Sequence, residues 1–351
     1  MSSIKKDWWK WLGVLILTLV ILIGLLVPLN PGITQVSPSN AASGTTVSVS
    51  ANGYNTFFTS AKSIRAWLKL AGDHALAAKS QEIISDNEII FTFDLPQYLP
   101  VEQLYAETAL VIDSDIDGAF VRPFALSINQ KEVNVELGEQ AWSVDKIHEL
   151  TETNHFRYPF RNILVETIRN TYFHVPLWFG MILLFLGSVI HSIKFLRKPD
   201  ELSDQKAVGF VSAGVLFGIM GLVTGAIWAK FTWGAFWSWD VKQNMSAICM
   251  LIYAAYFVLR QSMTDQDRRA RVSAVYNLFA FMAMIPLLFV IPRLTESLHP
   301  GNGGNPALGG EDLDNTMRMI FYPAIIGWTL LGVWMAQLKW RTLRIESRLR
   351  E

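Results

Sequence analysis

The chain has 351 residues, and its 30 Lys and Arg balance 30 Asp and Glu, so the formal net charge is zero. Charged residues make up only 17 % of the sequence, against about 25 % in a typical soluble domain, whereas Trp occurs 13 times. The neutral balance argues against a nucleic-acid-binding protein, which would carry a basic stripe. The single Cys excludes an intramolecular disulfide and a C-x-x-C redox pair.

Charged residues are missing from six long blocks of the sequence. A helix needs about 17–25 apolar residues to cross the hydrocarbon core of a bilayer, and we therefore predict six membrane-spanning helices. The blocks are Trp11–Val27, Thr171–Ile193, Ala207–Ala229, Asn244–Leu259, Val272–Pro292 and Met319–Leu338. The fourth is short, and we expect its helix to begin near Val241, with Lys242 reaching back to the interface.

The first block also has features of a secretory signal peptide, because basic residues precede its apolar run. Its candidate cleavage site, Asn40–Ser43, is poor and lies well downstream. Trp8, Trp9 and Trp11 are typical of an interfacial anchor. We therefore favour an uncleaved N-terminal membrane helix.

The distribution of Lys and Arg predicts the topology, because short cytoplasmic segments carry an excess of both. With the N-terminus inside, sixteen of these residues fall in cytoplasmic segments, and both termini lie on the cytoplasmic side. The segments predicted outside are 28–170, 230–243 and 293–318. Four basic residues fall in the two short outer loops: Lys230, Lys242, Arg293 and Arg318.

Residues 29–135 alternate apolar and polar side chains in short runs separated by turn residues, which predicts an antiparallel β-sandwich. The predicted strands are Thr45–Ser50, Ser63–Leu70, Glu88–Leu95, Ala109–Asp113 and Arg122–Asn129. The segments Gly32–Pro38 and Gly44–Val49 resemble immunoglobulin-like domains of the IPT/TIG type, for which a spacer or docking role is expected. Residues 136–170 mix charged and large apolar side chains, which indicates short amphipathic helices returning to the membrane surface.

Ionisable side chains inside a membrane are the usual functional candidates, and the six blocks contain no Asp, Glu, Lys or Arg. This argues against an ion-coupled transporter. Two of the six His, His174 and His299, lie on the same predicted outer side, whereas His191 lies at the cytoplasmic end of the second block. Two imidazoles on one side can ligate a haem iron from its two faces, although such a pair alone is not specific.

A cluster of aromatic residues occupies the outer loop between the third and fourth blocks. An aromatic belt at the interface accounts for one or two Trp. Four of them, with Gly234 and Asp240, favour a flat apolar platform for a large planar ligand. Asp240 is expected to cap the following helix or to hydrogen-bond within the loop. The four are Trp228, Trp233, Trp237 and Trp239.

This loop carries a recognisable motif. Trp233-Gly234-x-x-Trp237-x-Trp239-Asp240 resembles the WWD signature of haem-handling proteins in cytochrome c biogenesis. The chain most resembles their CcmC type, cytochrome c maturation protein C, over the first block and about residues 165–340. The segments that match this family in order are Arg169–Pro176, Leu222–Lys230 and Leu298–His299.

The sequence departs from that family at three places. The Trp residues that usually precede the second haem ligand are absent from the run Arg293–Gly301, and Phe236 stands where Trp is common. The β-sandwich is an insertion to which the family pattern assigns no role.

The resemblance implies that His174 and His299 ligate the iron of haem b, bound non-covalently and in transit. It implies a haem-binding loop formed by Trp233, Gly234, Trp237, Trp239 and Asp240. The protein would lie in the bacterial inner membrane and deliver haem to a periplasmic haem chaperone of the cytochrome c maturation E type. Its other implied partners are an ABC-type subunit and a small membrane subunit. Delivery of haem rather than enzymatic catalysis is expected.

The predicted fold is an all-α polytopic membrane protein with six transmembrane helices and an inserted β-sandwich on the periplasmic side. The predicted domains are an N-terminal anchor at 1–28, the sandwich at 29–135, an amphipathic linker at 136–170, a five-helix haem-handling domain at 171–340 and a basic tail at 341–351.

Two other functions fit parts of the sequence. A WWD protein of the CcsA or CcmF type joins haem to apocytochrome itself, but such proteins are typically larger, with more spans. A membrane-anchored sensor or adhesion protein would act through its β-sandwich, and its Trp loop would be an interfacial anchor only. Haem content separates these hypotheses. The basic residues of the outer loops are candidates for pairing with haem propionates, or for ordinary contacts with the membrane interface.

Overall fold

The computed structural model describes residues 2–72, 74–142, 147–153, 155–299, 309 and 313–349. The chain forms two compact units. One consists of Met1–Val27 and Glu166–Glu351 and is helical, and the other, Pro28–Val165, is rich in β-strands.

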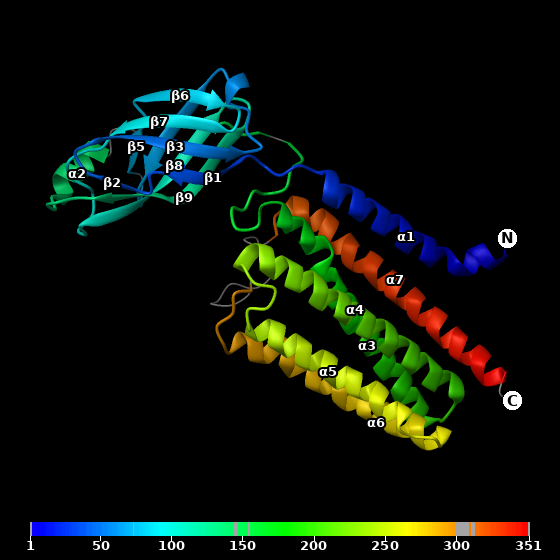
Figure 1. The fold of residues 1–351 in the computed structure, drawn as a ribbon. Helices are drawn as coiled ribbons and strands as arrows, with labels where there is room; N and C mark the ends of the chain where they lie inside the picture. The colour runs from blue at the N-terminus through cyan, green and yellow to red at the C-terminus, as the bar shows by residue number, and fades with distance from the viewer. Residues whose placement is uncertain are drawn as a thin grey trace. The chain divides into compact units, whose positions relative to one another are not determined.

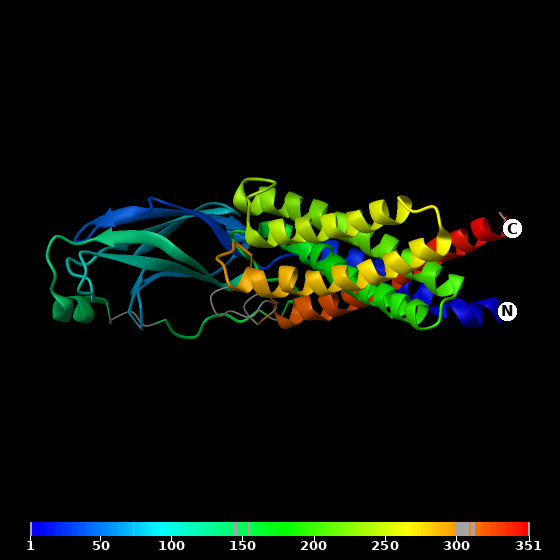
Figure 2. The same cartoon turned by 90° about the horizontal axis from the view of Figure 1, so that it is seen from below.

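The helical unit is a bundle of long helices that run alongside one another (Figures 1 and 2). They are α1 (Ser2–Leu26), α3 (His174–Arg197), α4 (Glu201–Trp233), α5 (Val241–Gln261), α6 (Gln266–Ile285) and α7 (Asn315–Arg348). A 3₁₀ segment, Val165–Tyr172, leads into α3, and α6 continues into a π-helical turn, Pro286–Val290, and a 3₁₀ turn, Ile291–Arg293. Both chain termini lie at the same end of the bundle (Figure 1).

Helix α4 is central to this bundle, because it contacts α3, α5 and α7, whereas α1 packs on α7. Small residues on α4 allow the close approach of α3. A Cβ atom at Gly214 would lie 2.6 Å from Cε1 of Phe185, and one at Gly180 of α3 would lie 3.0 Å from the Phe217 ring. The buried core of the unit forms around Phe185, Phe217 and Tyr253.

The predicted helices are all present, and five of them are long and apolar enough to cross a membrane. These five lie within Asp7–Leu26, Val165–Arg197, Glu201–Trp233, Gln266–Arg293 and Asn315–Arg348. Helix α5, the fourth predicted span, is not among them. Its first turn contains Lys242, Gln243 and Asn244, and it ends on Arg260 and Gln261, so its apolar stretch is short. The chain is thus a polytopic membrane protein with an inserted β-rich unit.

The β-rich unit is a sandwich of two sheets. One has the strand order β1-β3-β7-β6 and the other β2-β9-β8-β4-β5. The strands are β1 (Gly32–Ser37), β2 (Asn40–Ala42), β3 (Thr46–Tyr54), β4 (Ile64–Lys69), β5 (Ala75–Ala77), β6 (Ser80–Ser85), β7 (Glu88–Asp94), β8 (Tyr105–Ser114) and β9 (Gly118–Asn129). A short 3₁₀ turn, Phe58–Ser60, follows β3. Val49 and Phe91 of the first sheet and Leu68 and Leu110 of the second belong to one buried core.

The predicted strands correspond to β3, β4, β7, β8 and β9, while β1, β2, β5 and β6 were not predicted. The expected amphipathic helices of the linker are represented by α2 (Val135–Trp142). Helix α2 packs on the sandwich, because Trp142 is fully buried in the sandwich core. A Cβ at Gly138 would lie 2.3 Å from the Leu99 carbonyl, so this helix packs directly against the sandwich backbone.

Candidate functional site

A cavity of about 220 Å³ opens where α3 begins, α4 ends and α5 begins. His174 and His299 both line it, together with Trp237 of the loop between α4 and α5. The remaining wall is mainly apolar and comes from α3, α4, the first turns of α5 and the turns that follow α6. The structure therefore brings the two predicted iron ligands to one cavity, although they lie far apart in the sequence.

His174 is the first residue of α3, and its ring packs against α4. Its Nδ1 lies 3.0 Å from the carbonyl oxygen of Gly221 and 3.1 Å from the hydroxyl of Thr224. The Thr224 hydroxyl donates to the carbonyl of Met220 at 2.8 Å, so the proton between Thr224 and the imidazole belongs to the imidazole. Nδ1 of His174 therefore donates, and the lone pair of a neutral ring is left on Nε2.

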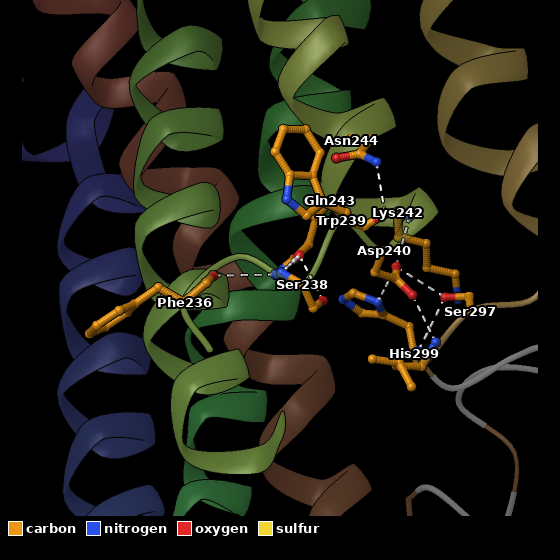
Figure 3. A network of polar contacts seen from close by, with 10 residues as sticks. Phe236, Ser238, Trp239, Asp240, Lys242, Gln243, Asn244, Ser297 and His299 are labelled. Carbon is orange, nitrogen blue, oxygen red and sulfur yellow. Dashed lines mark hydrogen bonds and ion pairs between the residues drawn. The ribbon is translucent and has the colours of Figure 1, made fainter. Parts of the chain in front are cut away.

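His299 is held by Asp240, the last residue of the Trp-rich motif. Its Nδ1 lies 2.8 Å from Oδ1 of Asp240 (Figure 3). The Asp240 side chain is only 2 % exposed, and the His299 side chain is 25 % exposed. As in His174, donation from Nδ1 leaves the lone pair of the ring on Nε2.

Asp240 accepts three further hydrogen bonds from residues that the structure describes. The backbone N–H of Lys242 and the hydroxyl of Ser297 donate to Oδ1 at 2.8 and 3.1 Å, and the backbone N–H of Leu298 donates to Oδ2 at 2.7 Å. Burial alone would raise the pKa of Asp240, but the hydrogen bonds from His299, Leu298 and Ser297 outweigh it and hold the pKa below its usual value. The carboxylate is therefore ionised, and the predicted N-cap of α5 is confirmed.

The Trp residues of the loop take different positions. Trp228 packs edge-on against His174, with ring centroids 5.8 Å apart, and Trp233 packs against His299 at 4.7 Å. Trp237 lines the cavity, whereas Trp239 is 77 % exposed and has a φ of 59°. Gly234 ends α4 in the left-handed conformation, with a φ of 84°.

Sequence reasoning missed the residues that hold the first imidazole. A Cβ atom at Gly225 would lie 2.6 Å from Cε1 of His174, and Gly221 contributes the carbonyl that accepts from the ring. Their spacing of four residues on α4 is the signal that could have identified a face for close approach. Of the four basic residues in the short outer loops, Lys242 alone lines the cavity, which the sequence did not distinguish.

Comparison with known proteins identifies the family. A family model described as Heme exporter protein C (CcmC) matches residues 158–351, which is more than half of the chain. The chain belongs to the heme exporter protein C family. The predicted resemblance of the chain to the CcmC type is thereby confirmed.

Curated relatives of two kinds are similar to the chain. Heme exporter protein C of Paracoccus denitrificans (strain Pd 1222) is 25 % identical over 176 residues, 50 % of this chain and 73 % of that protein. The same-named protein of Bradyrhizobium diazoefficiens is 27 % identical over 168 residues, 48 % of this chain and 63 % of that protein. Cytochrome c biogenesis protein CcsA of Synechococcus sp. (strain CC9311) is 40 % identical over 85 residues, 24 % of this chain and 27 % of that protein. The chain thus matches about a quarter of the CcsA relative's length.

Proposed function

We propose that this protein binds haem at the cavity, with His174 and His299 as axial ligands, and passes it on during cytochrome c biogenesis. One observation carries the proposal. Two imidazoles from distant parts of the chain line one cavity, and the hydrogen-bond network of each places its proton on Nδ1. Each ring then offers a neutral Nε2 donor, the form in which imidazole ligates a metal ion.

The cavity fits part of a planar macrocycle rather than a whole one. Trp178, Trp237 and Phe289 contribute apolar and aromatic wall, against which a porphyrin packs favourably. At about 220 Å³, the cavity is smaller than the about 300–1,000 Å³ typical of ligand pockets. A haem held here would leave an edge outside, which suits cargo that must be released.

The mode of binding follows from the donor groups present. The only Cys of the chain, Cys249, is 1 % exposed within α5 and does not line the cavity. This supports a cargo held without a thioether bond, and in this proposal the cargo is non-covalent haem b. Lys242 at the cavity wall supplies a cation for a propionate. In this proposal Trp233, Gly234 and Trp239 shape the loop that presents Trp237 and Asp240.

The proposed topology is that of six spans in the bacterial inner membrane, with both termini cytoplasmic and the cavity on the periplasmic side. Helix α5 is included because it packs against α4 and α6 and runs beside them in both views (Figures 1 and 2). The chain termini lie together at one end of the bundle. The loop between α4 and α5, which contains the Trp-rich motif, lies at the other end (Figure 1). The excess of Lys and Arg on the segments at the terminal end supports this orientation.

In this proposal the recipient is a periplasmic haem chaperone of the cytochrome c maturation E type, and an ABC-type subunit and a small membrane subunit complete the assembly. The β-sandwich, Pro28–Val165, serves as a docking module on the side from which haem leaves. Support comes from membership of the heme exporter protein C family over residues 158–351. The likeness to CcsA rests on a much shorter match, 85 residues, so haem delivery is favoured over haem attachment.

Haem content and ligand field test this proposal. The full-length protein, purified in detergent after haem supply, should show the absorption spectrum of six-coordinate haem. His174→Ala and His299→Ala should each convert it to a five-coordinate spectrum. His191→Ala is the matched control, because His191 also lies on α3 but does not line the cavity. A wild-type protein without haem, or ligand variants with unchanged spectra, would refute the proposal.

A further inference from the structure

The two proposed iron ligands differ in the groups that accept their Nδ1 protons. His174 donates to neutral acceptors, the carbonyl of Gly221 and the hydroxyl of Thr224. His299 donates to an ionised carboxylate, Asp240, at 2.8 Å. A carboxylate acceptor gives the imidazole partial imidazolate character and raises its basicity toward a metal, whereas a neutral carbonyl does so much less. If both rings ligate a haem iron, His299 would therefore be the stronger donor.

The two rings also differ in how they are held. His174 belongs to a helix, and its ring is enclosed by α4 and by the edges of Trp178 and Trp228, with centroids 6.2 and 5.8 Å away. His299 lies outside regular secondary structure. In the described part of the chain its ring contacts the Trp-rich loop, through Asp240 and Trp233. The position of His299 thus depends on that loop rather than on a helix of its own.

Asp240 holds the backbone beside His299 as well as the ring. Its Oδ2 accepts from the N–H of Leu298 at 2.7 Å, and its Oδ1 accepts from the Ser297 hydroxyl at 3.1 Å. The Ser297 hydroxyl in turn accepts from the N–H of His299 at 3.1 Å. Figure 3 shows these contacts converging on one buried carboxylate. The same carboxylate caps α5 through Lys242, so the start of α5 and His299 share one acceptor.

We propose that Asp240 is a positioning residue that fixes the Nε2 of His299 toward the iron and sets the strength of that axial bond. The aspartate of the Trp-rich motif then acts on haem through His299 and not by touching it. This inference rests on the proposed function. It adds the reason why the two proposed ligands would bind the iron with different strength.

The reduction potential of the bound haem tests this inference. Asp240→Asn retains an oxygen acceptor for Nδ1 but removes the charge, so haem should stay six-coordinate while ferric haem is bound more weakly. Loss of such an outer partner typically costs about 10–100-fold in metal affinity. Each tenfold loss confined to the ferric form raises the midpoint potential by about 59 mV. We therefore expect D240N to raise the potential, and D240A to give the five-coordinate spectrum of H299A.

Ser297→Ala leaves the carboxylate in place and should shift the midpoint potential in the opposite direction. Without the Ser297 hydroxyl, Asp240 is a stronger acceptor for His299, and the midpoint potential should fall. The matched control is Asp314→Asn, because Asp314 caps α7 by accepting from the N–H of Met317 at 2.7 Å. D314N removes the charge of a cap without contacting either proposed ligand, so the potential should not change.

Two outcomes would overturn the inference. If D240N and S297A leave the potential at its wild-type value, Asp240 does not act on the His299–iron bond. If D240N lowers haem content while the haem that remains keeps its wild-type potential, the carboxylate serves folding only. Both results require a wild-type protein that binds haem with a spectrum sensitive to H299A. A wild-type protein without haem refutes the proposed function instead, so the two failures are distinguishable.

Discussion

Substitution of Gly225 by Ala provides a sharp test of how α4 positions His174, the first of the two proposed ligands. The added methyl group would lie 2.6 Å from Cε1 and 3.2 Å from Nδ1 of His174, closer than side-chain carbons approach in proteins. The ring can move away only toward the cavity that it lines, and this movement would break its contacts with α4. Its Nδ1 is held at 3.0 Å from the Gly221 carbonyl, and Trp178 and Trp228 flank it edge-on.

The expected magnitude follows from this geometry. An ordinary contact distance of 3.4–4 Å requires the methyl group and the ring to separate by about 1 Å more. Forcing an extra methyl group into a packed site costs about 1–3 kcal/mol. If this strain is relieved by displacing His174 from its ligand position, haem binding weakens by about 5–150-fold. Gly225→Ala should therefore reduce haem affinity while the fold persists.

Haem titration of the purified full-length protein, followed by absorbance, measures this effect. Gly214→Ala is the matched control, because its Cβ would also lie 2.6 Å from a ring carbon, Cε1 of Phe185, on the same pair of helices. G214A should lower the melting temperature and leave haem affinity unchanged. Wild-type affinity in G225A, or an equal loss in G214A, would refute the positioning of His174 by Gly225.

Two further predictions concern the cargo and its recipient. Lys242→Ala should weaken haem binding by about tenfold or more, because a hydrogen bond to a charged group contributes about 1.5–3 kcal/mol. Haem dimethyl ester, which lacks free propionates, should bind the wild type and K242A equally. If K242A weakens binding of the ester as much as binding of haem, Lys242 does not pair with a propionate. In a second variant, residues 31–157 are excised and a short linker joins Asn30 to Tyr158. This variant should still bind haem but transfer it more slowly to the purified chaperone. Transfer at the wild-type rate would exclude docking through the sandwich. The backbone N–H of Asn30 donates to the carbonyl of Tyr158 at 2.7 Å, so these ends already meet.

The helices could be predicted from the sequence because a charge is costly in the hydrocarbon core, and charge-free blocks therefore mark them. Helix α5 shows the limit of this reasoning. Lys242, Gln243 and Asn244 begin the helix but are polar, so length and apolar composition do not identify it as a span. Its assignment depends on its packing against α4 and α6.

The strands could be predicted where one face is buried and the other exposed. β7 follows this alternation, whereas every residue of β6 is exposed, so its sequence carries no period of two. Strands β2 and β5 have three residues each, too few for a pattern to develop. Pairing with a neighbouring strand, rather than local sequence, determines these elements.

The sequence singled out the two His residues that line the cavity, but not the groups that hold them. His174 and His299 stood out because of their predicted side of the membrane and the motif between them. The hydrogen bond from His299 to Asp240 joins residues 59 positions apart. The sequence predicted that Asp240 caps the following helix or hydrogen-bonds within its loop, and it did not indicate this contact. The capping contact with Lys242 is one of its four hydrogen bonds to described residues.

The meeting of Pro28–Asn30 with Tyr158 has a consequence for how such a chain can acquire extra parts. The N–H of Tyr158 donates to the carbonyl of Pro28 at 2.9 Å, and Leu29 forms a parallel bridge with Tyr158. The two ends of the inserted stretch, residues 31–157, therefore lie next to each other. Doubling the length of a closed loop costs only about 0.6 kcal/mol, so a module of almost any size is tolerated there. The junction makes the sandwich exchangeable in evolution without respacing the helices that flank it.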